Sequence, residues 1–497
     1  MTLRTRAMLA VALTVGFYVL ALGLIAGLIW IVFIPDVPGR VIGFCLFGAA
    51  LIAIAIVPRP SRFSPPGPLL NPAGQPRLFA TLDDVARAVG EPMPAEVYIT
   101  PEMNAGVLQR GRRRVMVLGL PLMQIMSVSQ MRAVLAHEFG HYHGGDTRLG
   151  PWVYRTRETI ERTLRTVSRQ GALLQLPFLW YGQLFMRVSQ GVSRQQEFAA
   201  DQLAARTVGA KPMIEGLRKL ARGAIAFDAY WRNEVVPLIE AGFQPPLAEG
   251  FTRFLAEPAV MKGVTAAADE RLAKARPDPY DSHPPDAERI TALEASASPP
   301  AGQGPSTSPA GGEEPELAAI TLVDGVEIID SVILLGILKP GLQLRHISWA
   351  EAGTVALVPG LRERVRRQAG LVGAYTIGWI PELLKYSDKL GQSEATAAGV
   401  TAGPDQARSL GVGLAGAALA NALAQNGWTA ESLPGRPILM RRGDATLEPF
   451  VEVNKMVKGE MDADTWQRRC WDLGIRDLGL APTQAAPTQA APIQAER

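Results

Sequence analysis

The chain begins with two apolar runs that predict a transmembrane hairpin. Residues 8–34 and 41–57 carry no charged side chain, and each approaches or exceeds the length with which an α-helix crosses the bilayer core. A short loop with Pro35 and Pro38 separates the two runs. A cleaved signal peptide is the alternative for the first run, but that run is longer than a signal's apolar segment and a second follows at once.

Charges beside the hairpin predict its orientation. Arg4 and Arg6 precede the first run, and Arg59 and Arg62 follow the second. Positive residues are enriched on the cytoplasmic side of membrane proteins, so both ends of the hairpin are expected there. We therefore expect a multi-pass protein of the cell (inner) membrane with the remaining chain in the cytoplasm.

Shorter patterns follow a proline-rich linker at residues 59–77. Residues 82–89 have helical spacing, and residues 96–100 alternate as a β-strand does. Residues 104–109 and 115–120 flank a basic, turn-like segment, which predicts a β-hairpin. These elements precede the most informative stretch of the chain.

Residues 133–146 read AVLAHEFGHYHGGD and contain the pattern H-E-x-x-H. On a helix, His137 and His141 lie one turn apart on one face, where two imidazoles can hold one metal ion. Glu138 stands beside the first imidazole and can reach a metal-bound water. Ser127 and Gln130 have capping-box spacing, so a helix is expected to start there. Zinc suits these ligands because it accepts neutral imidazole and carboxylate and can leave one coordination position open.

A second candidate cluster, SRQQEFAAD, occupies residues 193–201. Glu197 and Asp201 are four residues apart on a predicted helix, so they share one face. Glu197 could complete a three-residue zinc site, and Asp201 could accept a hydrogen bond from a ligating imidazole. The alternative for this spacing alone is a solvated acidic stripe.

Residues 171–186 form an apolar, aromatic segment interrupted by Pro177. The segment is short for a full membrane span. An interfacial helix and a buried core helix remain equal alternatives for it.

The segment DSHPPDAERI at residues 281–290 predicts a loop that enters a helix, because two prolines precede helical spacing. His283 is one of five histidines in the chain, and Arg289 follows about two turns later. A role near the metal is a hypothesis for His283, against the simpler interpretation of a loop histidine.

Composition excludes several classes of protein. The net charge of +3 over 497 residues indicates no large basic surface for nucleic acid. Two cysteines, Cys45 and Cys470, form no disulfide framework and fit a reducing compartment.

Three motifs in this order behind a membrane hairpin, HEFGH, SRQQEFAAD and SHPPDAERI, resemble the membrane zinc metallopeptidases that include HtpX-like proteases and CAAX prenyl proteases. The likeness covers about residues 78–293 and is closer to the HtpX-like group. It implies a mainly α protein with a small β-sheet, a zincin-like α+β metalloprotease domain. The residue roles that it implies are zinc ligation by His137, His141 and Glu197, support from Asp201, a general base at Glu138, contact with substrate near the metal by His283 and Arg289, and substrate binding by Asn104 and Ala105.

The expected activity is that of a zinc metalloendopeptidase with one Zn²⁺ per chain. Glu138 would take a proton from the attacking water, and His283 or Arg289 would stabilise the oxyanion. Unfolded or membrane-adjacent polypeptides are the expected substrates, with a possible role in membrane protein quality control. The alternatives are a membrane-tethered scaffold with a structural zinc site and a zinc hydrolase that acts on a non-peptide bond.

A linker rich in Pro, Gly and Ser predicts a separate C-terminal domain without a catalytic motif. In that domain the small-residue segment 410–423 is too short to span a membrane and predicts a packed helix. The expected organisation is a transmembrane hairpin at 1–58, a linker at 59–77, a metallopeptidase domain at 78–295, a linker at 296–316, a C-terminal domain at 317–480 and a disordered repeat tail at 481–497.

Overall fold

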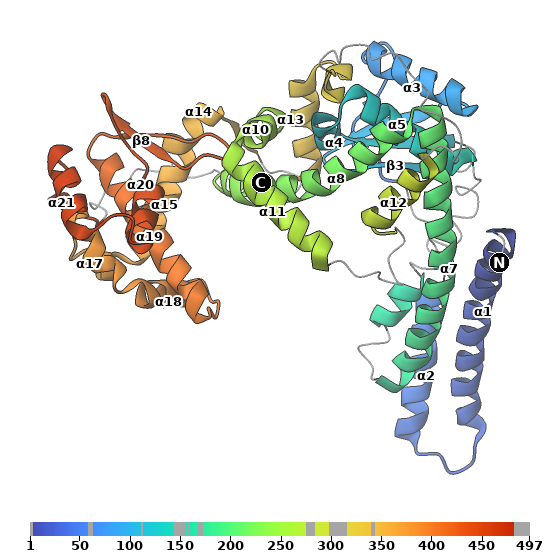
Figure 1. Ribbon diagram of the computed structural model, residues 1–497. Helices are drawn as coiled ribbons and strands as arrows, with labels where there is room; N and C mark the ends of the chain where they lie inside the picture. The colour runs from blue at the N-terminus through green and yellow to red at the C-terminus, as the bar shows by residue number, and fades with distance from the viewer. Residues whose placement is uncertain are drawn as a thin grey trace, which may run out of the picture. The chain divides into compact units, whose positions relative to one another are not determined.

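The computed structural model describes residues 3–57, 63–110, 113–143, 156, 159–166, 172–274, 284–297, 316–338 and 343–481. The chain forms two compact units. The first comprises residues 1–225 and 264–337, and the second comprises residues 226–263 and 338–497. The structure is mainly helical with small sheets, which confirms the predicted fold class (Figure 1).

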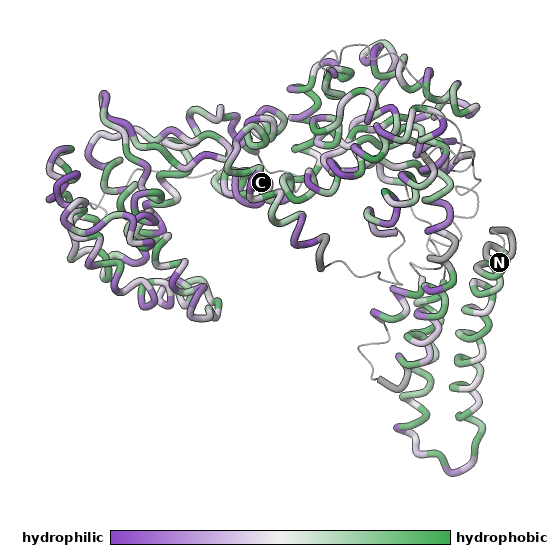
Figure 2. The backbone as a smooth tube through the Cα atoms, in the orientation of Figure 1, coloured by the Kyte–Doolittle hydropathy of each residue, from purple (hydrophilic) through white to green (hydrophobic). Residues whose placement is uncertain are grey.

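The N-terminal hairpin forms as predicted. Helix α1 (Leu3–Trp30) runs through a short 3-10 turn, η1 (Ile31–Phe33), and helix α2 (Gly39–Ile56) returns beside it. Both are long and apolar enough to cross a membrane, and Figure 2 shows hydrophobic residues along both. Asp36 adopts φ 63° in the connecting loop, a conformation that short polar side chains tolerate.

Helix α7 (Ala172–Thr207) joins two segments that the sequence analysis treated separately. One continuous helix of 36 residues includes Pro177, the apolar segment and the SRQQEFAAD motif. Its apolar half packs on the hairpin: Phe178 and Phe185 are buried in a cluster with Phe17 and Ile52. Residues 172–186 therefore belong to a helix that packs on the hairpin through the side carrying Phe178 and Phe185. Trp180 is exposed on another side of the same helix.

A four-stranded sheet with strand order β1-β2-β4-β3 lies in the first unit. β2 and β4 are parallel, and the other neighbours are antiparallel. The predicted strand 96–100 and the predicted hairpin are confirmed, and the predicted helix 82–89 starts earlier, at a proline in the first helical turn. The bounds are β1 (Leu69–Leu70), α3 (Pro76–Val89), β2 (Glu96–Thr100), β3 (Ala105–Arg110), β4 (Arg113–Gly119), α4 (Leu120–Ile125), α5 (Val128–His143) and α12 (Asp286–Ala297).

The segment after the low-complexity linker belongs to the first unit, which differs from the predicted boundary at residues 296–316. Ala318 forms a β-bridge with Ser127 directly before α5. Gln75 joins the segment to α3, since its side chain exchanges two hydrogen bonds of 2.8 Å with the backbone of Asp324. These contacts place η4 (Ala319–Leu322) and α13 (Val326–Ile337) in the first unit. Residue types alone do not reveal such pairing.

The second unit likewise takes residues from the middle of the predicted metallopeptidase domain. β5 (Phe243–Gln244) pairs with β6 (Arg345–His346), and Tyr230 packs against Phe251 and Trp349. These pairings need partners from both parts of the chain. Further elements of this unit are η3 (Trp231–Val235), α9 (Val236–Glu240), α10 (Leu247–Ala256), α14 (Trp349–Ala352), η5 (Gly353–Leu357), α15 (Val358–Arg367) and α16 (Ala369–Val372). Two helices, α8 (Ala210–Tyr230) and α11 (Pro258–Lys274), have residues in both units.

The core of the second unit surrounds α19 (Pro404–Gln425). This helix of 22 residues is long and apolar enough to span a membrane, so the expectation that the segment is too short is wrong, but 67% of its apolar 18-residue window is buried inside the protein. This agrees with the predicted packed helix. Gly391 allows α18 to lie close against α19, because a Cβ at Gly391 would lie 1.6 Å from the carbonyl oxygen of Ala407 on α19. The other elements are η6 (Ile377–Trp379), α17 (Ile380–Leu384), α18 (Ser387–Ala397), β7 (Thr429–Glu431), β8 (Leu439–Arg442), β9 (Ala445–Leu447), α20 (Pro449–Val457) and α21 (Ala463–Asp472).

The Gln75 contact leads to a testable expectation for the segment around Asp324. Gln75→Ala leaves two backbone groups of Asp324 without their side-chain partner, a loss of about 1–3 kcal/mol for buried groups. We expect amide hydrogen exchange in residues 317–324 to become at least five-fold faster, as about 1 kcal/mol implies. Arg77→Ala is the control, because its ion pair with Asp324 is exposed and contributes little. Equal exchange in both variants would contradict the assignment.

Candidate metal centre

Helix α5 presents the two histidines of the HEFGH motif. Its start matches the predicted capping box: the Ser127 backbone N–H donates to Gln130 Oε1 at 3.0 Å, and the Gln130 backbone N–H donates to Ser127 Oγ at 3.3 Å. Leu135 and Phe139 are fully buried and fix which face of α5 turns inward. The two imidazoles therefore project together from the adjoining face.

Gly140 lets α7 approach α5 closely. A Cβ at this position would lie 3.1 Å from both the Cα and the Cβ of Ala200 on α7. That distance is tighter than ordinary packing, so the small pair Gly140 and Ala200 sets the separation of the two helices. The sequence analysis did not single out Gly140, although a glycine inside a helix pattern signals a packing requirement.

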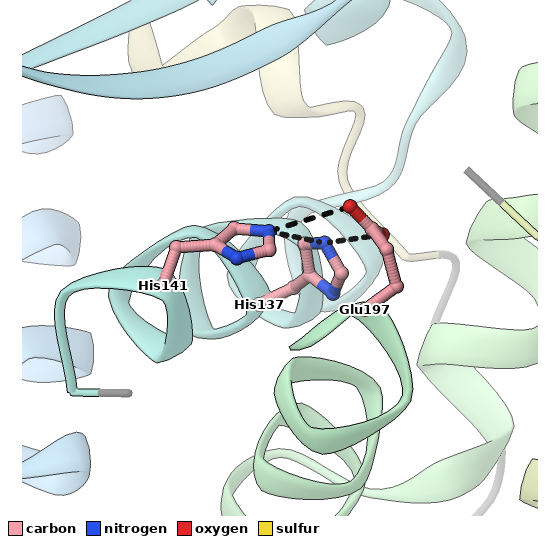
Figure 3. A group of neighbouring side chains, drawn as sticks. All are labelled: His137, His141 and Glu197. Carbon is pink, nitrogen blue, oxygen red and sulfur yellow. Dashed lines mark hydrogen bonds and ion pairs between the residues drawn. The ribbon is translucent and has the colours of Figure 1, made fainter. Parts of the chain in front are cut away.

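The three predicted metal ligands meet at this helix contact (Figure 3). His137 Nε2 and His141 Nε2 are 3.2 Å apart. Glu197 Oε2 lies 3.4 Å from His137 Nε2, and Glu197 Oε1 lies 3.7 Å from His141 Nε2. One candidate ligand atom from each residue falls within 4.8 Å of the others.

These separations fit a zinc ion. Ligand atoms at about 2.0–2.1 Å from a tetrahedral zinc lie about 3.3 Å from one another. Two imidazoles and one carboxylate are also ligands that zinc prefers, and a three-residue set leaves one position for a water or substrate. The donor set and its spacing thus suit a catalytic type of zinc site.

Asp201 lies one turn beyond Glu197 and contacts the first imidazole. Its Oδ1 is 2.9 Å from His137 Nδ1, while His137 Nε2 faces the ligand group. Burial alone would lower the pKa of His137, but hydrogen bonds to Asp201 and Glu197 outweigh it and raise that pKa to about 9. The carboxylates therefore make this pocket attractive to a cation.

Arg289 of α12 is buried behind the ligands. Its Nε donates to Asp201 Oδ2 at 2.8 Å, and its Nη1 lies 3.5 Å from Glu197 Oε2. Burial alone would raise the pKa of Asp201, but the hydrogen bonds from Arg289 and His137 hold it below its usual value. The sequence analysis expected Arg289 to face substrate. Because its guanidinium instead contacts two carboxylates, we assign it a positioning role.

Glu138 is 8% exposed and follows His137 on α5. Its charge acts on that imidazole. The proton transfer expected of Glu138 stays a prediction. His283, the other predicted catalytic residue, lies outside the described residues.

β3 forms one end of the four-stranded sheet, and α5 packs beside it. The carbonyl of Asn104 accepts from the Gly119 N–H at 2.8 Å, so its backbone turns toward β4. Along an antiparallel pair, successive residues point their N–H and C=O groups alternately toward and away from the partner strand. Because Asn104 bonds to β4, the N–H and C=O groups of Ala105 and Val107 point away from β4. Asn104 and Ala105 thus begin an edge next to the metal helix.

Comparisons with known proteins agree with this site. Residues 72–297 match the model of peptidase family M48. Protease HtpX of Idiomarina loihiensis is 30% identical over 164 residues, which cover 29% of this chain and 57% of that relative. Protease HtpX of Tolumonas auensis is 31% identical over 169 residues, which cover 29% of this chain and 58% of that relative. The chain thus matches under two thirds of the length of these relatives. No solved structure matches it significantly.

The positioning role of Arg289 can be tested by metal binding. Arg289→Lys keeps the charge but removes the planar group that contacts both carboxylates. We expect zinc affinity to fall about ten-fold, as loss of groups that orient metal ligands commonly does. Competition with a chelator measures this effect. Arg218→Lys is the matched control, because Arg218 pairs with Glu294 of the same helix α12 at an exposed position. Unchanged affinity in Arg289→Lys would remove the assigned role.

Proposed function

We propose that this chain, whose residues 72–297 match the model of peptidase family M48, is a membrane-anchored zinc metalloendopeptidase. The observation that carries the proposal is the meeting of His137, His141 and Glu197 beside Glu138. The hairpin formed by α1 and α2 supplies the membrane anchor. The names of the HtpX relatives support the same activity.

The residues of this chain divide the chemistry between them. His137, His141 and Glu197 would hold zinc, which supplies Lewis acidity toward water and the scissile carbonyl. The Glu138 carboxylate accepts a proton from the attacking water and returns it to the leaving amine. Asp201 and Arg289 keep the His137 imidazole and the Glu197 carboxylate in place.

The open edge of β3 would bind the substrate. An extended peptide can add to a sheet edge through main-chain hydrogen bonds, which give affinity with little reading of sequence. Ala105 and Val107 direct backbone groups toward such a peptide. This mode favours unfolded or membrane-adjacent polypeptides as substrates. From the charges beside the hairpin, we propose that cleavage takes place on the cytoplasmic side.

The composition of the site favours catalysis over a structural zinc site. Structural zinc is almost always enclosed by four protein ligands. Among the described residues, this cluster contains three candidate ligands and adjoins Glu138. A scaffold with structural zinc would not need a carboxylate in that position.

The assignment of Glu138 can be tested by Glu138→Gln in the purified full chain. Loss of a general base commonly lowers a rate by about 10²–10⁴-fold. We expect a loss of casein cleavage in that range with zinc content unchanged. Glu327→Gln on the surface of α13 is the control and should keep full activity. If Glu138→Gln cleaves casein at the control rate, Glu138 is not the base.

The edge-strand proposal can be tested with a proline. Val107→Pro removes a backbone N–H that points away from β4, and proline is tolerated in edge strands. We expect KM for a peptide substrate to rise several-fold, by about the 0.5–1.5 kcal/mol of one hydrogen bond, with little change in kcat. Val107→Ala keeps the N–H and serves as the control. Equal KM values for both variants would argue against strand addition at this edge.

A further inference from the structure

The four-stranded sheet has two unlike faces. The residues on one face, including Val97, Met116 and Leu118, are buried, and Arg114 on that face stacks on Tyr142 of α5. Strand register places a different set of side chains on the opposite face, because alternate residues point in opposite directions. We call this second set the outer face. By strand register it comprises Leu69, Glu96, Tyr98, Thr100, Gly106, Leu108, Arg110, Arg113, Val115 and Val117.

The middle of the outer face is buried, because Val115, Thr100 and Tyr98 are 0%, 2% and 5% exposed, whereas basic and apolar side chains at its margin contact water. The side chains of Arg110 and Arg113 are 51% and 69% exposed. Leu69 and Leu108, on the outermost strands, are 57% and 36% exposed. Exposed leucines beside arginines are typical of surfaces that meet a membrane interface.

The positive charge on this face is only partly neutralised. Arg113 Nη1 lies 3.1 Å from Glu96 Oε1, and Arg110 Nη1 lies 3.9 Å from the same oxygen. The hydrogen bonds from Tyr98 and Arg113 lower the pKa of Glu96, so the carboxylate is charged at neutral pH. Two guanidinium groups therefore share one carboxylate, which leaves about one net positive charge.

The chain that leaves the membrane contacts this face. Phe63 packs on Tyr98 with ring centroids 6.0 Å apart, and the Arg110 guanidinium lies 4.5 Å from the centre of the Phe63 ring. Phe63 follows Ile56, the last residue of α2, by seven positions. Seven residues span at most about 25 Å when fully extended. Phe63 therefore lies within that distance of the end of α2, and the part of the outer face that it contacts lies beside it.

We propose that the outer face binds the headgroups of anionic phospholipids in the bilayer that holds the hairpin. Guanidinium groups pair well with phosphate, and basic groups near a transmembrane helix are attracted to anionic lipid. Leu69 and Leu108 contact the apolar side of the headgroup layer. This role is separate from the proposed peptidase activity, because none of these residues touches the ligand cluster.

An acidic peptide is the other occupant that two arginines could bind. The arrangement favours the membrane, because the two exposed leucines lie on the two outermost strands, while the two arginines lie on β3 and β4. A peptide that adds to β3 would meet Arg110 alone at the end of the strand. The lipid surface can contact both arginines and both leucines together.

Lipid selectivity of the reconstituted full chain tests this proposal. The chain is placed in phosphatidylcholine nanodiscs with trace spin-labelled phosphatidylglycerol or spin-labelled phosphatidylcholine, and the immobilised fraction of each label is measured. We expect Arg110→Gln/Arg113→Gln to lower the association of phosphatidylglycerol relative to phosphatidylcholine by at least five-fold, because the variant removes two positive charges and each is worth about 1 kcal/mol near anionic lipid.

The matched control is Arg366→Gln/Arg367→Gln on α15. These arginines also share one carboxylate, that of Glu363, and are 69% and 61% exposed. This double variant changes the total charge equally and should keep wild-type selectivity. A second measurement uses the wild-type chain alone: raising salt from about 0.05 to 0.5 M should reduce its selectivity, because screening weakens exposed charges.

Three results would overturn the proposal. One is equal phosphatidylglycerol selectivity in the wild type and in both double variants. The other is unchanged lipid selectivity with a raised KM for acidic peptides in Arg110→Gln/Arg113→Gln, which would assign the arginines to substrate. Wild-type selectivity that does not respond to salt would also exclude an electrostatic headgroup contact.

Discussion

The structure of the candidate site depends on the close approach of two helices. α5 supplies two imidazoles one turn apart, but two nitrogens do not enclose a metal ion. Gly140 and Ala200 let α7 come near enough for Glu197 to reach them. A larger side chain at either position would separate the helices by more than ligand geometry allows, since ligand atoms need spacings of about 3.3 Å.

The buried ion pair of Arg289 and Asp201 stabilises this arrangement at a cost. Both side chains are almost fully buried, and removing two charges from water is unfavourable unless their hydrogen bonds are satisfied. The planar guanidinium satisfies both oxygens of Asp201 and also approaches Glu197. The pair fixes the orientation of the two carboxylates more than it adds stability. It also joins α12, far along the chain, to α5 and α7.

Helix α7 connects the membrane region to the metal centre without a break. Its first half packs on Phe17 and Ile52 of the hairpin, and its second half carries Glu197 and Asp201. A continuous helix is stiff, so the height of the ligand carboxylate above the hairpin is largely set by the length of α7. The linker near Phe63 ties the sheet to the same hairpin. Two separate connections thus relate the β3 edge and the candidate ligand group to the apolar hairpin.

The sequence by itself determined the local features of this protein. Apolar runs gave the hairpin, and the spacing of His137, Glu138 and His141 gave the metal helix, because both depend on short-range periodicity. It also gave Glu197 and Asp201 as candidates, with the likeness to a known family deciding their roles. Tertiary structure alone decided that α7 is one helix, that residues 317–337 join the metallopeptidase unit, and that Arg289 contacts Asp201. These facts rest on backbone pairing and side-chain contacts between segments far apart in the chain, which periodicity does not record.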